Sequence, residues 1–113
     1  MAGTFYTDKI RPNAANTQCL DLGYALSAWS ADTNYTALQA DYSCAVIKLA
    51  PTLTTTRNYV MPLTSGALIT FVNASGQSIQ IIGASGTGFT IATGKTAMGR
   101  CDGTNWYRVT ADV

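Results

Sequence analysis

The stretch Met98-Gly99-Arg100-Cys101-Asp102-Gly103-Thr104-Asn105-Trp106-Tyr107-Arg108-Val109 decides the fold class of this chain. Its centre, Asp102-Gly103, is a residue pair that accepts the positive φ angles of a tight two-residue hairpin turn. Apolar and aromatic residues stand on both sides and can pair across that turn. The stretch therefore predicts a β-hairpin with strands over 96–101 and 105–110.

Strand-like segments separated by turn residues continue upstream of this hairpin. The clearest are 57–61, which Pro62 ends, and 67–73, which the turn Ala74-Ser75-Gly76 follows. We expect 78–82 to pair with 67–73 as a hairpin. The other expected elements are an edge strand or extended arm over 3–11, a short strand over 17–22, either a helix or a strand over 23–29, one helical turn within 37–42, and strands over 44–49 and 89–92.

Short strands at intervals of about 8–12 residues are typical of a β-sandwich or barrel. We see no internal repeat of solenoid length in the sequence. The expected fold is all-β, a jelly-roll-like antiparallel β-sandwich. Residues 1–16 would form an N-terminal arm or edge strand, and 17–113 a single domain.

Length and composition narrow the class of protein. The 113 residues match one domain, and no apolar run approaches the ~20 residues that span a bilayer. The first residues, 1–9, have no apolar core of a signal peptide, so we expect folding in a cytoplasm. Cys19, Cys44 and Cys101 are widely spaced, and we expect buried thiols, with one disulfide and a spare thiol as the alternative.

The charge content is low. Only 12% of residues are charged, against about 25% in an ordinary soluble domain, and the formal net charge is +1. Such a surface repels its neighbours weakly and tends to associate. No basic stripe is present, so we expect neither nucleic acid nor a membrane as a partner.

Motifs for catalysis or cofactor binding are weak. Gly94-Lys95-Thr96 resembles the end of a phosphate-binding loop, but the motif needs glycine where Phe89 stands. The chain has no histidine, which serine and cysteine nucleophile sets require as a base. A catalytic pair among the six aspartates is conceivable, but solvated loop carboxylates explain them better. We therefore expect no enzyme, no metal and no cofactor.

Aromatic residues are the group best suited to binding. Tryptophan and tyrosine can stack on sugars or anchor a protein interface. We expect Trp106 in the core, whereas for Trp29 a core position and a partner interface remain equally open.

Four segments of the chain resemble a β-module of tailed-phage virion proteins. They are Tyr59-Val60-Met61-Pro62-Leu63, Gly66-Ala67-Leu68-Ile69-Thr70-Phe71-Val72-Asn73, Gly94-Lys95-Thr96-Ala97 and Cys101-Asp102-Gly103-Thr104-Asn105-Trp106-Tyr107. The opening Phe5-Tyr6-Thr7-Asp8-Lys9-Ile10 is also similar to the starts of fibre and decoration chains. The module occurs in tail fibres, capsid fibres and capsid decoration proteins.

The resemblance implies a structural virion protein. Because the chain has no length for a fibre shaft, it is most similar to a capsid decoration, or cement, protein on the capsid exterior. Its implied partners are the major capsid protein and further copies of itself, with Phe5, Tyr6 and Ile10 as apolar anchors of the arm and Trp29 as a further interface candidate. The alternative is a tail or fibre-tip domain that recognises host surface glycans.

Overall fold

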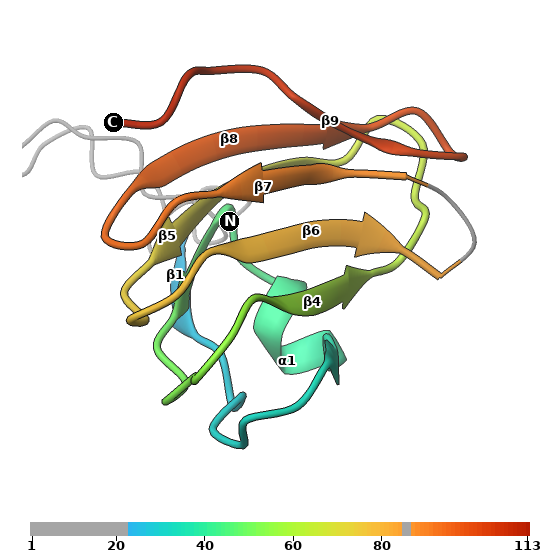
Figure 1. The fold of residues 1–113 in the computed structure, drawn as a ribbon. Helices are drawn as coiled ribbons and strands as arrows, with labels where there is room; N and C mark the ends of the chain where they lie inside the picture. The colour runs from blue at the N-terminus through green and yellow to red at the C-terminus, as the bar shows by residue number, and fades with distance from the viewer. Residues whose placement is uncertain (1–22, 85–86) are drawn as a thin grey trace, which may run out of the picture.

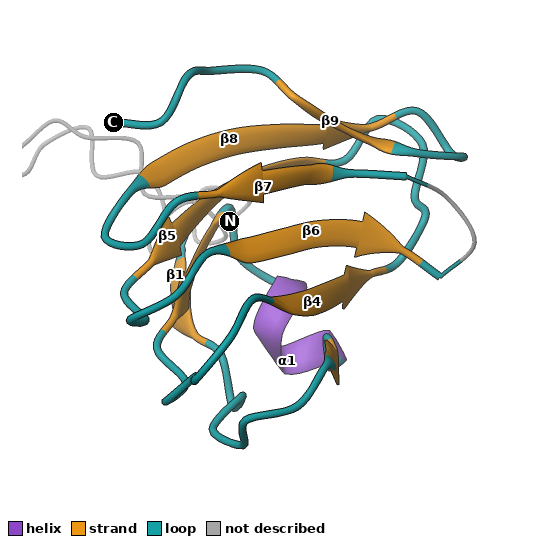
Figure 2. Ribbon diagram, in the orientation of Figure 1, coloured by secondary structure: helices purple, strands orange, loops and turns teal. Residues whose placement is uncertain are grey.

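A computed structural model describes residues 23–84 and 87–113 of the chain. This part is all-β, with nine strands and one four-residue helix (Figures 1 and 2). The elements are β1 (Tyr24–Leu26), β2 (Tyr35–Thr36), α1 (Gln39–Tyr42), β3 (Val46–Leu49), β4 (Arg57–Met61), β5 (Leu68–Asn73), β6 (Ile79–Gly83), β7 (Phe89–Ile91), β8 (Thr96–Cys101) and β9 (Trp106–Arg108). The predicted arm over 1–16 and strand over 17–22 lie outside the described residues.

The strands form two mixed sheets. One has five strands in the order β1-β3-β5-β8-β9, and the other has four in the order β2-β4-β6-β7. The pairs β1–β3, β3–β5, β2–β4 and β4–β6 are parallel, whereas β5–β8, β6–β7 and β8–β9 are antiparallel. The expectation of an antiparallel, jelly-roll-like arrangement is therefore wrong in its strand directions.

The parallel pairs arise because the chain alternates between the two sheets. From β1 to β6 each successive strand enters the other sheet, so that β1–β2, β3–β4 and β5–β6 form three stacked coils. Tyr24 pairs with Val46 and Val46 with Thr70, at intervals of 22 and 24 residues. This is the organisation of a β-solenoid, in which each coil contacts its neighbours. The coils form although the sequence shows no internal repeat, because the register pairs dissimilar residues such as Tyr24, Val46 and Thr70.

The expected hairpin between 67–73 and 78–82 is also wrong, because β5 and β6 belong to different sheets. The chain turns between the sheets at Asn73, whose side chain is 1% exposed. The Asn73 amide nitrogen donates to the carbonyl oxygens of Gln77, Ile91 and Ala92 at 2.9, 3.0 and 3.2 Å. Its amide oxygen accepts from the backbone N–H and the hydroxyl of Ser75. These hydrogen bonds make 73–77 a corner between the sheets.

The β8–β9 hairpin is confirmed, with a longer turn than expected. Cys101 pairs with Trp106, so four residues form the loop. The Asp102 carboxylate accepts the backbone N–H groups of Thr104 and Asn105, both at 2.9 Å, and Gly103 has a φ of +97°. An Asx-type turn therefore replaces the predicted two-residue turn.

Aromatic side chains link the two sheets through the core. The rings of Trp29, Tyr35 and Tyr59 stack on one another with centroids 5.5–5.8 Å apart. Tyr59 in β4 then meets Phe71 in β5 edge to face, and Phe71 meets Trp106 in the same way. Trp106 is 1% exposed, which confirms its predicted core position.

The β7–β9 end of the molecule is closed by antiparallel strands and the C-terminal segment. The backbone N–H of Trp106 donates to Thr87 O, and the Arg108 guanidinium donates to Thr90 O. Arg108 also lies over the Phe89 ring and pairs with Asp112, which in turn accepts the Ala92 N–H. Contacts of this kind cap one end of the coil stack, as terminal repeats do in solenoids.

Candidate protein-interaction surface

The outward side of the five-stranded sheet carries an unusual set of side chains. Alternation along each strand turns every second residue away from the core. The residues that face outward, which we call the outer face, are Tyr24, Leu26, Val46, Lys48, Leu68, Thr70, Val72, Thr96, Met98, Arg100 and Tyr107. Seven of these eleven are apolar or aromatic, so the outer face is unlike an ordinary solvated sheet surface.

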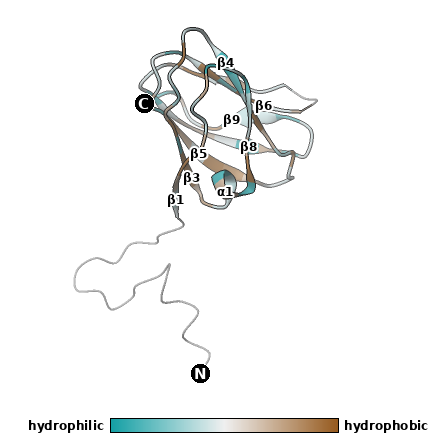
Figure 3. Ribbon diagram, turned by 90° about the horizontal axis from the view of Figure 1, so that it is seen from below, coloured by the Kyte–Doolittle hydropathy of each residue, from teal (hydrophilic) through white to brown (hydrophobic). Residues whose placement is uncertain are grey.

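Strand register arranges the outer face in three rows. The first joins Leu68, Arg100 and Tyr107, which pair across β5, β8 and β9. The second row is Tyr24, Val46, Thr70 and Met98, and the third is Leu26, Lys48, Val72 and Thr96. Figure 3 colours the ribbon by hydropathy and shows brown stretches on this sheet. Residues far apart in sequence thus form one continuous patch.

Large apolar side chains on the outer face are well exposed. Tyr24, Leu26, Leu68 and Tyr107 are 59, 63, 51 and 47% exposed. A patch of this kind marks a candidate interaction site, whereas scattered single apolar residues do not. The opposite outward side, on the four-stranded sheet, is mainly hydroxyl and amide: Thr36, Asn58, Val60, Gln80, Ile82 and Thr90.

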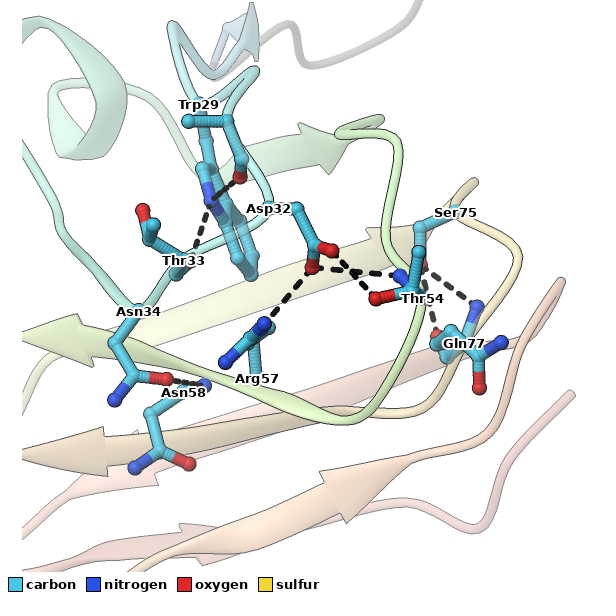
Figure 4. Close-up of polar contacts among 10 residues, drawn as sticks. Trp29, Asp32, Thr33, Asn34, Thr54, Arg57, Asn58, Ser75 and Gln77 are labelled. Atoms are coloured by element: carbon cyan, nitrogen blue, oxygen red, sulfur yellow. Dashed lines mark hydrogen bonds and ion pairs between the residues drawn. The ribbon is translucent and has the colours of Figure 1, made fainter.

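The only charges on the outer face are the cations Lys48 and Arg100. Neither is in an ion pair within the part of the chain that the structure describes, where the pairs are Arg57–Asp32 and Arg108–Asp112. The carboxylates among the described residues are instead bonded to other groups of this chain. Side-chain hydrogen bonds from Thr54 and Arg57 hold the pKa of Asp32 below its usual value (Figure 4). The pKa of Asp102 is lowered by the turn N–H groups, and that of Asp112 by Arg108.

Asp41, in α1, is a buried carboxylate with a structural role. It is 2% exposed and accepts hydrogen bonds from the N–H groups of Ala28 and Leu38 and from the Tyr35 hydroxyl, at 3.0–3.1 Å. Burial alone would raise the pKa of Asp41, but these hydrogen bonds outweigh it and hold the pKa below its usual value. Burial also raises the pKa of Tyr59, so its hydroxyl stays protonated and donates to Ser27. The cluster ties α1 to the aromatic stack.

Of the predicted interface residues, Phe5, Tyr6 and Ile10 lie outside the described residues. Trp29 is in the core, 2% exposed, and its indole N–H donates to the carbonyl oxygens of Ala31 and Thr33. An interface role for Trp29 stays a prediction, and it would have to act through the residues that cover the ring. The sequence analysis does not identify the outer face. A signal was present in 68–73, where Leu68 and Val72 put apolar side chains on the face opposite to Ile69 and Phe71.

Within residues 23–84 and 87–113, no group of three His, Cys, Asp or Glu side chains is placed to hold a metal ion. The same part of the chain contains no helix long and apolar enough to cross a membrane. Comparison with protein-family models, curated proteins and solved structures finds no match to this chain.

Proposed function

We propose that this chain is a structural virion protein, a capsid decoration protein that binds over junctions of the major capsid protein. The observation that carries the proposal is the outer face, an apolar sheet surface whose only charges are Lys48 and Arg100. The virion setting comes from the resemblance of the Tyr59–Tyr107 segments to phage modules. In this setting the two sheets act as a rigid, sandwich-like plate on the capsid exterior.

The chemistry of the outer face selects the kind of surface it would bind. Exposed Leu68 and Tyr107 flank Arg100, so the complementary partner is an apolar protein surface with acidic groups at matching positions. A nucleic acid would need more phosphate contacts than two cations supply. An acidic protein surface is therefore the better complement.

The energetics favour a repeated lattice over an isolated partner. Burying the exposed half of a leucine or tyrosine side chain contributes roughly 1 kcal/mol. Association itself costs about 4–15 kcal/mol, so one such face binds weakly. Many equivalent sites on a shell, together with copies joined to one another, would multiply weak contacts through avidity. Binding only to the assembled shell would then stabilise it by mass action.

The experiment is co-sedimentation of the purified full chain with shells of the virus, comparing two charge reversals. Arg100→Glu changes the outer face, whereas Lys95→Glu makes the same change of net charge in the turn before β8. We expect Arg100→Glu to weaken shell binding by roughly tenfold, about 1.4 kcal/mol, and Lys95→Glu to leave it nearly unchanged. Equal effects of the two substitutions would show that the outer face does not contact the shell.

A second candidate function, a tail or fibre-tip domain that recognises host glycans, is favoured by the three parallel coils. A β-solenoid shaft extends by adding coils and needs a closed end, which β7–β9 would supply. The exposed rings of Tyr24 and Tyr107 could then stack on sugars. This candidate predicts saturable binding of host glycans that Tyr107→Ala abolishes. Trp29→Ala is a poor test because it removes a core side chain.

A further inference from the structure

Among the described residues, β1 is the edge strand of the five-stranded sheet. Val46 N–H donates to Gly23 O, and Ser27 N–H donates to Lys48 O, so the backbone groups of residues 23 and 27 face β3. Because backbone groups alternate in direction along a strand, those of Tyr24 and Leu26 point away from β3. No strand among the described residues pairs with this side of β1.

Within residues 23–84 and 87–113, the β1 edge has none of the features that usually protect a sheet edge. Natural edges carry charged residues, proline or a bulge, or are covered by another element. The sequence of β1 is Tyr24-Ala25-Leu26, with two large apolar side chains that are more than half exposed. The opposite end of the molecule is closed by β9 and the C-terminal segment, so within the described part of the chain the two ends differ in their exposure of backbone.

We propose that a second copy of this chain pairs with the β1 edge, antiparallel, about a two-fold axis through Ala25. In this register Tyr24 lies opposite Leu26 of the second copy, and Leu26 opposite its Tyr24. Each outward N–H and C=O then finds a partner, and both cross-strand pairs join an aromatic to an aliphatic side chain. The contact is isologous, because the same three residues supply both halves.

Charge is compatible with this contact. β1 itself is uncharged, and the nearest cation on the outer face is Lys48 in β3. Two Lys48 residues related by the axis would be separated by three strand spacings, about 14 Å. That distance exceeds the Debye length of about 8 Å at physiological ionic strength. The pairing also joins two outer faces into one patch of twice the width.

The chain's own N-terminal segment is a poorer occupant of the edge. A preceding coil at the observed intervals of 22 and 24 residues would place residues 11–13 beside Tyr35 in β2. These residues are Arg11-Pro12-Asn13, and proline lacks the N–H that a ladder requires. A second copy does not meet this obstacle.

The first experiment measures the mass of the full chain by sedimentation equilibrium over a wide concentration range. We expect a monomer–dimer equilibrium whose dissociation constant rises by roughly tenfold or more in Leu26→Lys. Leu26→Pro, which removes one outward N–H, should act in the same direction. Leu68→Lys is the matched control on β5, away from the edge, and should leave the dissociation constant within about twofold. A monomer at every concentration, a trimer, or a dimer that ignores both Leu26 substitutions would overturn the proposal.

Amide hydrogen exchange in the wild-type chain gives a test that needs no variant. We expect the Tyr24 and Leu26 amides to be protected at concentrations where the dimer forms and to lose protection on dilution. Protection that persists in the monomer would mean that this chain's own residues cover the edge, and absence of protection at all concentrations would mean that nothing does. Either result would overturn the second-copy assignment. The proposal does not depend on the proposed function, because Arg100→Glu should weaken shell binding while leaving the dimer intact.

Discussion

Replacing Asn73 with alanine should destabilise the fold more than any surface substitution. The Asn73 amide nitrogen serves three carbonyl oxygens and its amide oxygen accepts two bonds from Ser75. Each net hydrogen bond contributes roughly 1 kcal/mol, and the hydroxyl of Ser75 keeps its bond to Gln77 O after the substitution. The carbonyl oxygens of Ile91 and Ala92 would lose a donor. We therefore expect the free energy of unfolding to fall by about 3 kcal/mol.

The assay is urea unfolding followed by tryptophan fluorescence, supported by thermal unfolding. A loss of this size lowers Tm by about 12 °C in a domain of roughly 100 residues. Asn58→Ala is the matched control, because Asn58 lies half-buried on the outward side of β4 and its backbone N–H, which alanine keeps, makes the bond to Asn34. The control should change stability by less than about 0.5 kcal/mol. If Asn73→Ala cost no more than Asn58→Ala, the corner between the sheets would not depend on the Asn73 side chain.

Three further predictions concern the core. The pKa of Asp41 is lower in the folded than in the unfolded chain, so the carboxylate contributes its full stabilisation above the unfolded pKa near 4 and loses it as the pH falls through the folded pKa. Urea unfolding from pH 7 to 2 should show this loss of stability in the wild type and a smaller loss in Asp41→Asn. Gly99→Ala should lower stability by about 1–3 kcal/mol, since a Cβ at this position would stand 2.5 Å from the Phe89 ring; an unchanged urea midpoint would contradict this packing. Cys101, which is fully buried, should react with a thiol reagent only after unfolding, whereas the partly exposed Cys44 should react in the native protein. Labelling of the native and the unfolded protein, followed by peptide mass spectrometry, shows which of the two thiols has reacted in each.

The sequence predicted where most strands lie, because that information is local. Alternating apolar residues and nearby turn residues located β4 and β8 at their observed ends and β5 within one residue. The single helical turn within 37–42 was also predicted correctly. Periodicity and turn chemistry depend on neighbours a few residues apart, so they are visible without a structure.

The parallel strand pairing could not be predicted, because it joins residues more than 20 positions apart. The rungs of the coils pair dissimilar residues, such as Tyr59 with Ile81 and Val46 with Thr70, so no repeated motif reveals the period. The turn after β5 is recognised from the sequence, but its geometry is not, because Asn73 donates to the carbonyl oxygens of Ile91, the last residue of β7, and of Ala92, which follows β7. A local turn signal does not distinguish a hairpin from a corner between sheets.

The candidate site was missed for a related reason. Lys48, Arg100 and Tyr107 are ordinary surface residues in sequence, and only the order β3-β5-β8-β9 places them on one face. Conversely, Trp29 was considered for an interface because its surrounding sequence has little periodicity. Its burial depends on stacking with Tyr35 and Tyr59, which again requires the parallel pairing of β2 with β4.

The copy number of this chain in purified virions tests the central claim most directly. Quantitative mass spectrometry of the particle, referenced to the major capsid protein, gives the ratio of the two chains. A decoration protein bound at every equivalent junction should be present in numbers comparable to the capsid protein. A few copies per particle would contradict the decoration role and favour the tail or fibre-tip function. Absence from the particle would contradict both.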